Sequence, residues 1–124
     1  MEGQVDEEQL NTSRVIKVET LETWESSVIR GSPVVAHFTA SWCVPSVAMS
    51  PFFEELASSY LNVQFLTVDV DDVQEVAARL GVTAMPTFLV MKEGKQVDKI
   101  VGANPEVIRK RIDGHVQSIR MYST

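Results

Sequence analysis

A short apolar run at residues 33–39 constrains the fold more than any other feature of the sequence. It reads Pro-Val-Val-Ala-His-Phe-Thr and is almost continuously apolar and rich in β-branched residues. A strand with one solvated face alternates apolar and polar residues, whereas a continuous apolar run is typical of a strand covered on both faces, as in parallel sheets. We therefore expect residues 33–39 to form a central strand of such a sheet.

The rest of the chain alternates strands and helices around this run. Apolar spacing, caps and glycine stops predict strands at 15–18, 33–39, 63–70, 86–91 and 95–101, and helices at about 20–29, 44–60, 72–80 and 104–119. Pro51 should kink the second helix, because proline lacks a backbone donor. The short connection at residues 92–94 fits only an antiparallel pair. The pattern predicts an α/β protein with a mixed sheet.

The first 13 residues differ from the rest. Glu2, Asp6, Glu7 and Glu8 contribute −4 of the formal net charge of −6, and few apolar residues lie among them. Such a segment cannot bury enough surface to order itself, so we interpret residues 1–13 as a mobile acidic leader. Residues 14–124 have the length of one domain.

Charge and hydropathy argue against several classes of function. Lys and Arg are outnumbered 11 to 17 by Asp and Glu and do not cluster, so neither nucleic acid nor an anionic membrane surface is an expected partner. No apolar run approaches the roughly 18 residues of a membrane-spanning helix, and the amino terminus lacks a secretory signal pattern. We expect a cytoplasmic protein. A single cysteine, Cys43, excludes any disulfide within the chain.

Cys43 is the candidate nucleophile. It lies between the central strand and the second helix, at or just before the amino end of that helix. Unpaired backbone donors and the helix dipole at such a position favour the thiolate, which is the form that attacks disulfides. The alternative interpretation is a buried structural cysteine that behaves as a small hydrophobe.

The segment FTASWCVPS at residues 38–46 resembles the thioredoxin active-site segment W-C-G-P-C, with Ser46 in place of the second cysteine and Val44 in place of glycine. AMPTF at 84–88 resembles the thioredoxin loop that carries a cis-proline, here Pro86, and Val-Gly-Ala at 101–103 resembles the glycine turn beside the site. Pro51 follows Cys43 by eight residues, where the family kinks its helix. The likeness covers residues 15–119 and is greatest to plant h-type thioredoxins, and among them to the monocysteinic C-x-x-S type. It implies the thioredoxin fold, a central mixed sheet of about five strands flanked by four helices.

Two departures from the family pattern concern the chemistry of Cys43. In a dithiol thioredoxin the second cysteine resolves the mixed disulfide with the substrate, and Ser46 cannot attack sulfur. The Ser46 hydroxyl, one helical turn away, can still donate a hydrogen bond to the Cys43 thiolate. His37 stands where thioredoxins bury an aspartate, and Thr67 where they usually have the accompanying lysine. His37 either tunes Cys43 or is a core histidine satisfied by a carbonyl or a water.

The resemblance also implies an apolar surface for protein substrates around Cys43. Its members are Trp42, Val44, Pro45, Met85, Pro86, Val101, Gly102 and Ala103. Trp42 and Met85 could equally be packing residues. His115, near the end of the last helix, is interpreted as a solvated residue, and no metal or organic cofactor is predicted.

Three functions remain open at this point. In the first, Cys43 forms a mixed disulfide with a protein substrate and acts as a disulfide isomerase with weak reductase activity, because the substrate supplies the resolving thiol. In the second, the chain is a non-catalytic partner-binding module with Cys43 as a redox latch. In the third, glutathione is a co-substrate for thiol transfer. The expected state is a monomer, with a Cys43-linked homodimer also open.

Overall fold

One five-stranded mixed sheet organises the protein. The computed structural model describes residues 13–29 and 31–123, of which 117–123 are described by their backbone alone, so the predicted leader lies outside the described residues except for Ser13. The strands are β1 (Val15–Val18), β2 (Val34–Thr39), β3 (Gln64–Asp69), β4 (Thr87–Lys92) and β5 (Lys95–Val101). Their order is β1-β3-β2-β4-β5; β1, β3 and β2 are parallel, and β4 and β5 are antiparallel to their neighbours. The prediction of a central strand at 33–39 is confirmed.

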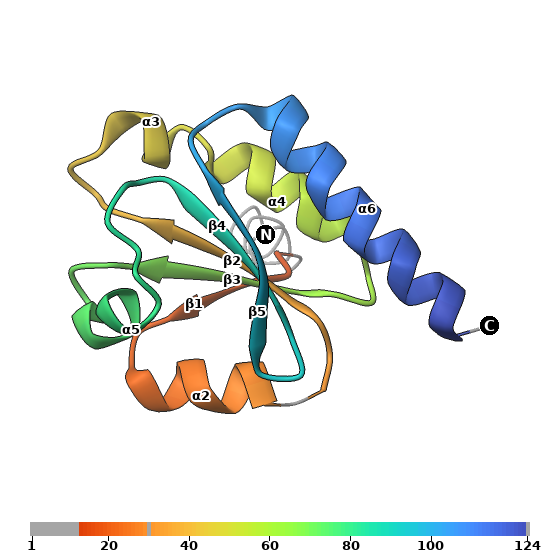
Figure 1. The fold of residues 1–124 in the computed structure, drawn as a ribbon. Helices are drawn as coiled ribbons and strands as arrows, with labels where there is room; N and C mark the ends of the chain where they lie inside the picture. Colours follow the sequence, from red (N-terminus) through yellow and green to blue (C-terminus); the bar gives the residue numbers. More distant parts are fainter. Residues whose placement is uncertain (1–12, 30, 124) are drawn as a thin grey trace, which may run out of the picture.

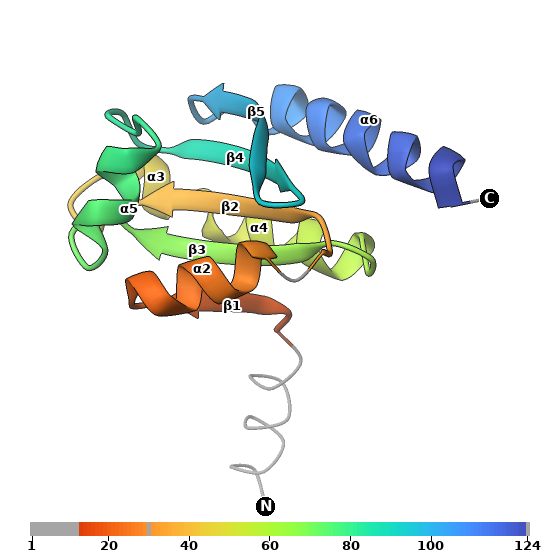
Figure 2. The ribbon, with the colours of Figure 1, turned by 60° about the horizontal axis from the view of Figure 1, so that its bottom comes forward.

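Helices cover both faces of this sheet. They are α2 (Leu21–Ile29), α3 (Val44–Val47), α4 (Ser50–Ser59), α5 (Gln74–Arg79) and α6 (Pro105–Ser123). Figures 1 and 2 show α2 and α5 on one face and α4 and α6 on the other. No helix in the described part of the chain is both long enough and apolar enough to span a membrane.

Burial on both faces explains the continuous apolar sequence of β2. Val34, Ala36 and Phe38 are fully buried in the core cluster that includes α2 and α5, while Val35 lies in the cluster that includes α4 and α6. His37 points to the second face, where its ring stacks on Phe88 with centroids 4.6 Å apart. The alternation of a strand therefore places one imidazole inside an otherwise apolar layer.

The single helix predicted at 44–60 is wrong, because the structure has two separate helices in this range. Ala48 and Met49 form a turn that separates α3 from α4, and Pro51 lies in the first turn of α4. Pro51 has no N–H to donate to the carbonyl of Val47, so one helical hydrogen bond is missing where the two helices meet. The expected kink is thus a break, and Cys43 precedes a helix of only four residues.

The ends of the other elements follow local chemistry. The Thr20 hydroxyl accepts a hydrogen bond from the Thr23 amide at 3.1 Å, and Asn104 Oδ1 accepts one from the Glu106 amide at 3.1 Å, as side-chain caps do. Glu93 and Gly94 both have positive φ, 54° and 77°, as a two-residue hairpin turn of type I′ requires.

The last helix begins at Pro105 as predicted but departs from its prediction at its carboxyl end and in the burial of one valine. α6 extends to Ser123, beyond the predicted end at Ile119, whose side chain lies outside the described residues. Ile108, Ile112 and Val116 are buried as expected, but Val107 is 43% exposed. Val107 lies one position before Ile108, which turns it by about 100° from the buried stripe.

Arg14 joins the start of the domain to the end of α4. Its guanidinium donates hydrogen bonds to the carbonyl oxygens of Ala57, of Tyr60 at 3.2 Å, of Leu61 at 3.2 Å and of Val63 at 3.3 Å. The last carbonyls of a helix have no partner within it, so a multidentate cation satisfies them and complements the negative end of the dipole. β1 is thereby fixed against the α4–β3 connection.

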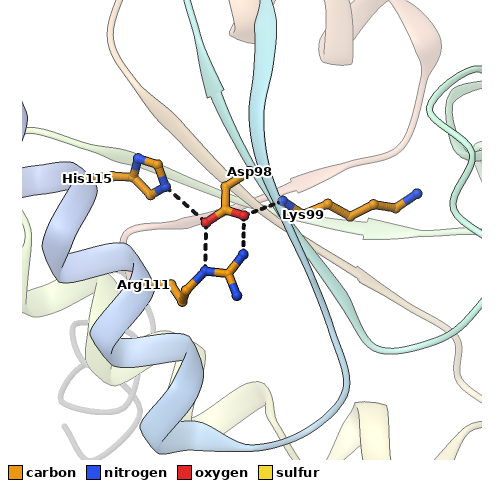
Figure 3. A network of polar contacts seen from close by, with 4 residues as sticks. All are labelled: Asp98, Lys99, Arg111 and His115. Carbon is orange, nitrogen blue, oxygen red and sulfur yellow. Dashed lines mark hydrogen bonds and ion pairs between the residues drawn. The ribbon is translucent and has the colours of Figure 1, made fainter.

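A polar network joins α6 to β5 (Figure 3). Asp98 accepts hydrogen bonds from both Nε and Nη2 of Arg111, from His115 Nε2 at 3.0 Å and from the Lys99 amide at 2.8 Å. The Arg111 guanidinium lowers the pKa of the Asp98 carboxyl to about 2. His115 is half-buried and paired, so its interpretation as a solvated residue is wrong, because the antiparallel return of β5 brings a carboxylate to it.

Candidate active site

Cys43 lies at the carboxyl end of β2, as the N-cap residue of α3. Its backbone is extended, with φ −103° and ψ 100°, and its amide donates to the carbonyl of Ala40 at 3.0 Å. The side chain is half-buried, and its Sγ donates a hydrogen bond to the carbonyl oxygen of Met85 at 3.5 Å. The thiol is therefore reachable from solvent and lies against the loop that precedes β4.

Three connections meet around this thiol. The Met85–Pro86 peptide bond is cis, as the resemblance to the family implied. The carbonyl oxygen of Pro86 accepts a hydrogen bond from the Gly102 amide at 3.0 Å, and Gly102 has a φ of 117°, which favours glycine. The predicted site residues of the β2–α3, α5–β4 and β5–α6 connections are thus brought together.

The short helix offers Cys43 fewer backbone donors than expected. Pro45 has no N–H, and the amides of Ser46 and Val47 donate to the carbonyl of Cys43 itself, at 3.1 and 3.0 Å. A single helical turn also carries only a small dipole. The long helix expected after Cys43 is therefore replaced by one of four residues, which ends before Ala48.

The Ser46 hydroxyl is occupied away from Cys43. Ser46 is fully buried, and its Oγ donates to Thr39 Oγ1 at 2.6 Å and lies 3.5 Å from His37 Nε2. Among the residues that the structure describes, no hydrogen bond joins the Ser46 hydroxyl to the Cys43 sulfur. The one proton of the hydroxyl is donated to Thr39 at the end of β2 and not to the sulfur.

His37 is a neutral core histidine that contacts Ser46. Burial lowers its pKa to about 4, because an imidazolium would lose its hydration there. Its ring packs against Phe53 and Phe88, and its Nδ1 has no hydrogen-bond partner in the described part of the protein. The burial expected of a core histidine is confirmed, while in the described residues the hydrogen-bonding neighbour of the ring is the Ser46 hydroxyl and not a carbonyl.

The predicted apolar surface separates into exposed and buried members. Trp42, Val44 and Val101 are 64, 76 and 59% exposed, and Pro45 and Ala103 are also exposed. Gly102 and Met85 are half-buried, and Met85 packs against the core, whereas Pro86 is buried. The exposed side chains surround a half-buried thiol, which suits an apolar polypeptide that must approach a sulfur.

Two further residues shape the site and were missing from the sequence-based prediction. Asp71 Oδ2 accepts a hydrogen bond from Trp42 Nε1 at 2.9 Å, and Thr39 holds the Ser46 hydroxyl. The parallel pairing of β2 with β3, which brings Asp69 opposite Thr39, is the signal that could have found Asp71. No three His, Cys, Asp or Glu side chains gather in a way that could hold a metal ion in the described residues.

Comparison with known proteins gives one consistent result. The thioredoxin family model matches residues 15–114. The "Thioredoxin-like protein CXXS1" of Arabidopsis thaliana is 55% identical over 113 residues, which are 88% of this chain and 96% of that protein, and the rice protein of the same name is 50% identical over 88% and 85%. The crystal structure of thioredoxin NaTrxh from Nicotiana alata has a TM-score of 0.78 and 38% identity, covering 83% of this chain and 93% of that one.

Proposed function

This chain belongs to the thioredoxin family of thiol–disulfide oxidoreductases, and we propose that within it the chain acts as a one-cysteine protein disulfide isomerase with weak reductase activity. Cys43 is the proposed nucleophile. The exposed surface of Trp42, Val44 and Val101 is the proposed contact for a polypeptide substrate.

The proposed cycle conserves thiols and disulfides. The Cys43 thiolate attacks one sulfur of a non-native substrate disulfide, forming a Cys43–substrate disulfide while the other substrate sulfur leaves as a thiolate. A second thiolate of the same substrate then attacks the substrate sulfur of this mixed disulfide. A new substrate disulfide forms, and Cys43 leaves as the thiolate. Because no electrons are gained or lost overall, the cycle needs no external reductant.

One observation carries this proposal: the residue one helical turn after the nucleophile is Ser46, buried and bonded to Thr39. A dithiol protein would resolve the mixed disulfide with a thiol at this position. Here Cys43 is the only thiol of the chain, so the resolving sulfur must come from the substrate or from a small thiol. Net reduction would consume an external thiol such as glutathione at every turnover, which favours isomerisation over reduction.

The relatives support the same assignment. Two plant relatives, at 55 and 50% identity, carry the name CXXS1, which fits a site with one cysteine and a serine three residues on. Thioredoxin H1 of Arabidopsis thaliana is 42% identical over 107 residues, so a fold used for disulfide exchange is retained around the altered site.

Recovery of activity from scrambled ribonuclease tests the proposal. Catalytic amounts of the wild-type chain, Cys43→Ser and Ser46→Cys are compared, each with and without glutathione. We expect turnover by the wild-type chain without glutathione, none by Cys43→Ser, and disulfide reductase activity that rises in Ser46→Cys when an external reductant is supplied.

Three results would contradict this function. Turnover that survives Cys43→Ser would remove Cys43 from the mechanism. A stable mixed disulfide at Cys43 without turnover would instead support the partner-binding module with a redox latch, and turnover only with glutathione would support thiol transfer.

A further inference from the structure

We propose that the surface around Cys43 selects its substrates by charge, and that it favours polypeptide segments in which basic residues flank an apolar stretch around the reacting cysteine. This inference rests on the disulfide-exchange function proposed above and names the substrate class for the same site. We call the surface the Cys43 face, which consists of Trp42, Val44, Val101, Asp71 and Asp72.

The chain segments around Cys43 carry acidic residues and no basic ones. Residues 40–47, 69–73, 83–86 and 101–105 contain Asp69, Asp71 and Asp72 but neither Lys nor Arg. The wider stretch from 31 to 78 likewise holds six Asp and Glu and neither Lys nor Arg, although the chain has 11 basic residues. The negative charge of these segments is therefore uncompensated within them.

Direct contacts bring this charge to the active site. Trp42 follows Ser41 in the active-site loop, and its Nε1 donates to Asp71 Oδ2 at 2.9 Å. The Asp71 amide donates to Asp69 Oδ1 at 2.8 Å, and the Val70 amide donates to the carbonyl of Thr39 at 2.9 Å. The β3–α5 connection is thus held beside the loop that carries Cys43. Asp71 and Asp72 are both exposed there.

Two basic side chains of the adjoining elements, Arg79 and Lys99, are engaged elsewhere. Arg79, at the end of α5, pairs with Glu25 at 3.2 Å and Glu75 at 3.0 Å. Lys99, on β5, donates from Nζ to the carbonyl of Gly81 at 2.8 Å. Neither of these contacts directs a cation to Asp71. The negative electrostatic potential of the carboxylates beside Trp42 is therefore not reduced by Arg79 or Lys99.

The Cys43 face therefore has an apolar centre and an acidic edge. Docking an apolar segment on Trp42, Val44 and Val101 removes water beside Asp71, and a charge pair gains strength when water is excluded. A complementary substrate segment has apolar side chains such as leucine next to its cysteine, and Lys or Arg at the positions that follow these apolar residues. Glutathione, which has two carboxylates and one ammonium, is mismatched in charge.

Matched peptide disulfides test this inference. The probes are acetyl-Lys-Leu-Cys-Leu-Lys-amide and acetyl-Glu-Leu-Cys-Leu-Glu-amide, each with a 2-pyridylthio group on the cysteine sulfur. Cys43 thiolate attacks the peptide sulfur, the disulfide to the pyridyl group breaks, and pyridine-2-thiolate leaves, so one absorbance reports both rates. Rates with 2-mercaptoethanol correct for the intrinsic reactivity of each probe.

We expect the wild-type chain to react about tenfold faster with the Lys peptide than with the Glu peptide at low salt, after this correction. Asp71→Asn combined with Asp72→Asn should reduce the preference about threefold or more, and 0.5 M NaCl should do the same. The control is Glu93→Gln, in the β4–β5 turn, which removes one charge about 20 Å along β4 from the site. It should retain the wild-type preference.

Failure of this inference is distinct from failure of the proposed function. A wild-type preference no greater than that of 2-mercaptoethanol, or an equal loss in Glu93→Gln, would overturn charge selection at the Cys43 face even if scrambled ribonuclease is rescued. A preference that depends on Asp71 and Asp72 would support it even if the chain proves to be a latch without turnover.

Discussion

Acidification should weaken the folded state through His37. The pKa of His37 falls from 6.5 to about 4 on folding, because the buried imidazole cannot be hydrated as a cation. A group held neutral in the fold contributes stability that is fully present above pH 6.5. That contribution is lost as the pH falls from 6.5 towards 4, since the unfolded chain takes up the proton first.

The size of this effect follows from the two pKa values. A difference of about 2.5 units corresponds to roughly 3 kcal/mol below pH 4, and about 2 kcal/mol of it is already lost at pH 5. Asp98 does not interfere, because its pKa of about 2 places its own loss of stability below pH 4. The interval from pH 8 to pH 5 therefore isolates the histidine.

Urea unfolding at pH 8, 6.5 and 5 measures the effect in the wild-type chain and in His37→Leu. The free energy of unfolding of the wild-type chain should decline with falling pH by about 2 kcal/mol more than that of the variant. Groups other than His37 are common to both chains and cancel in this difference. Parallel declines in the two chains would refute the argument that this imidazole is buried neutral.

Substitutions at three other positions test the structure elsewhere. Arg14→Ala should lower the free energy of unfolding in urea by about 1–3 kcal/mol, because it leaves helix-end carbonyls without a donor. Arg14→Lys should recover only part of this loss of stability. An unchanged urea midpoint in Arg14→Ala would contradict the contact. Glu93→Asn should increase the free energy of unfolding by about 0.5–1 kcal/mol and raise the thermal midpoint, since asparagine tolerates the positive φ at this position. A lower midpoint would contradict the positive φ assigned to this turn. Asp98→Asn should be less stable than the wild-type chain at pH 7. The difference in free energy of unfolding between the two chains should become smaller from pH 5 to 2.5, because the wild-type carboxyl takes up a proton. A difference that stays constant over this range would contradict a stabilising ion pair at Asp98.

Much of the fold could be predicted from apolar periodicity and turn chemistry. The β2 run, the caps at Thr20 and Asn104 and the short hairpin all depend on residues close together in the sequence, and the structure confirms them. The break between α3 and α4 was predicted only as a kink. A missing donor at Pro51 says that a helix is disturbed, but the packing of the turns around it decides whether it bends or stops.

Contacts between distant residues limited the prediction of the site. Cys43, Ser46 and Pro86 were recognisable from local motifs, whereas the partner of each polar side chain depended on strand order. Trp42 meets Asp71 and His115 meets Asp98 only because the sheet brings separate segments together. For the Ser46 hydroxyl, the sequence allowed a bond to Cys43, and the bond to Thr39 depends on how the loop between β2 and α3 folds back.

The buried hydroxyl of Ser46 also bears on how this chain can evolve. A reversion to cysteine restores the second thiol, yet a thiol is a weaker hydrogen-bonding group than a hydroxyl, so Thr39 and His37 would lose part of the contact that Ser46 now gives them. The new thiol would also lie beside a neutral imidazole, where the family pattern described above has an aspartate. A change of Ser46 alone would therefore reduce stability before it restores dithiol chemistry, and this makes a single-step return unfavourable.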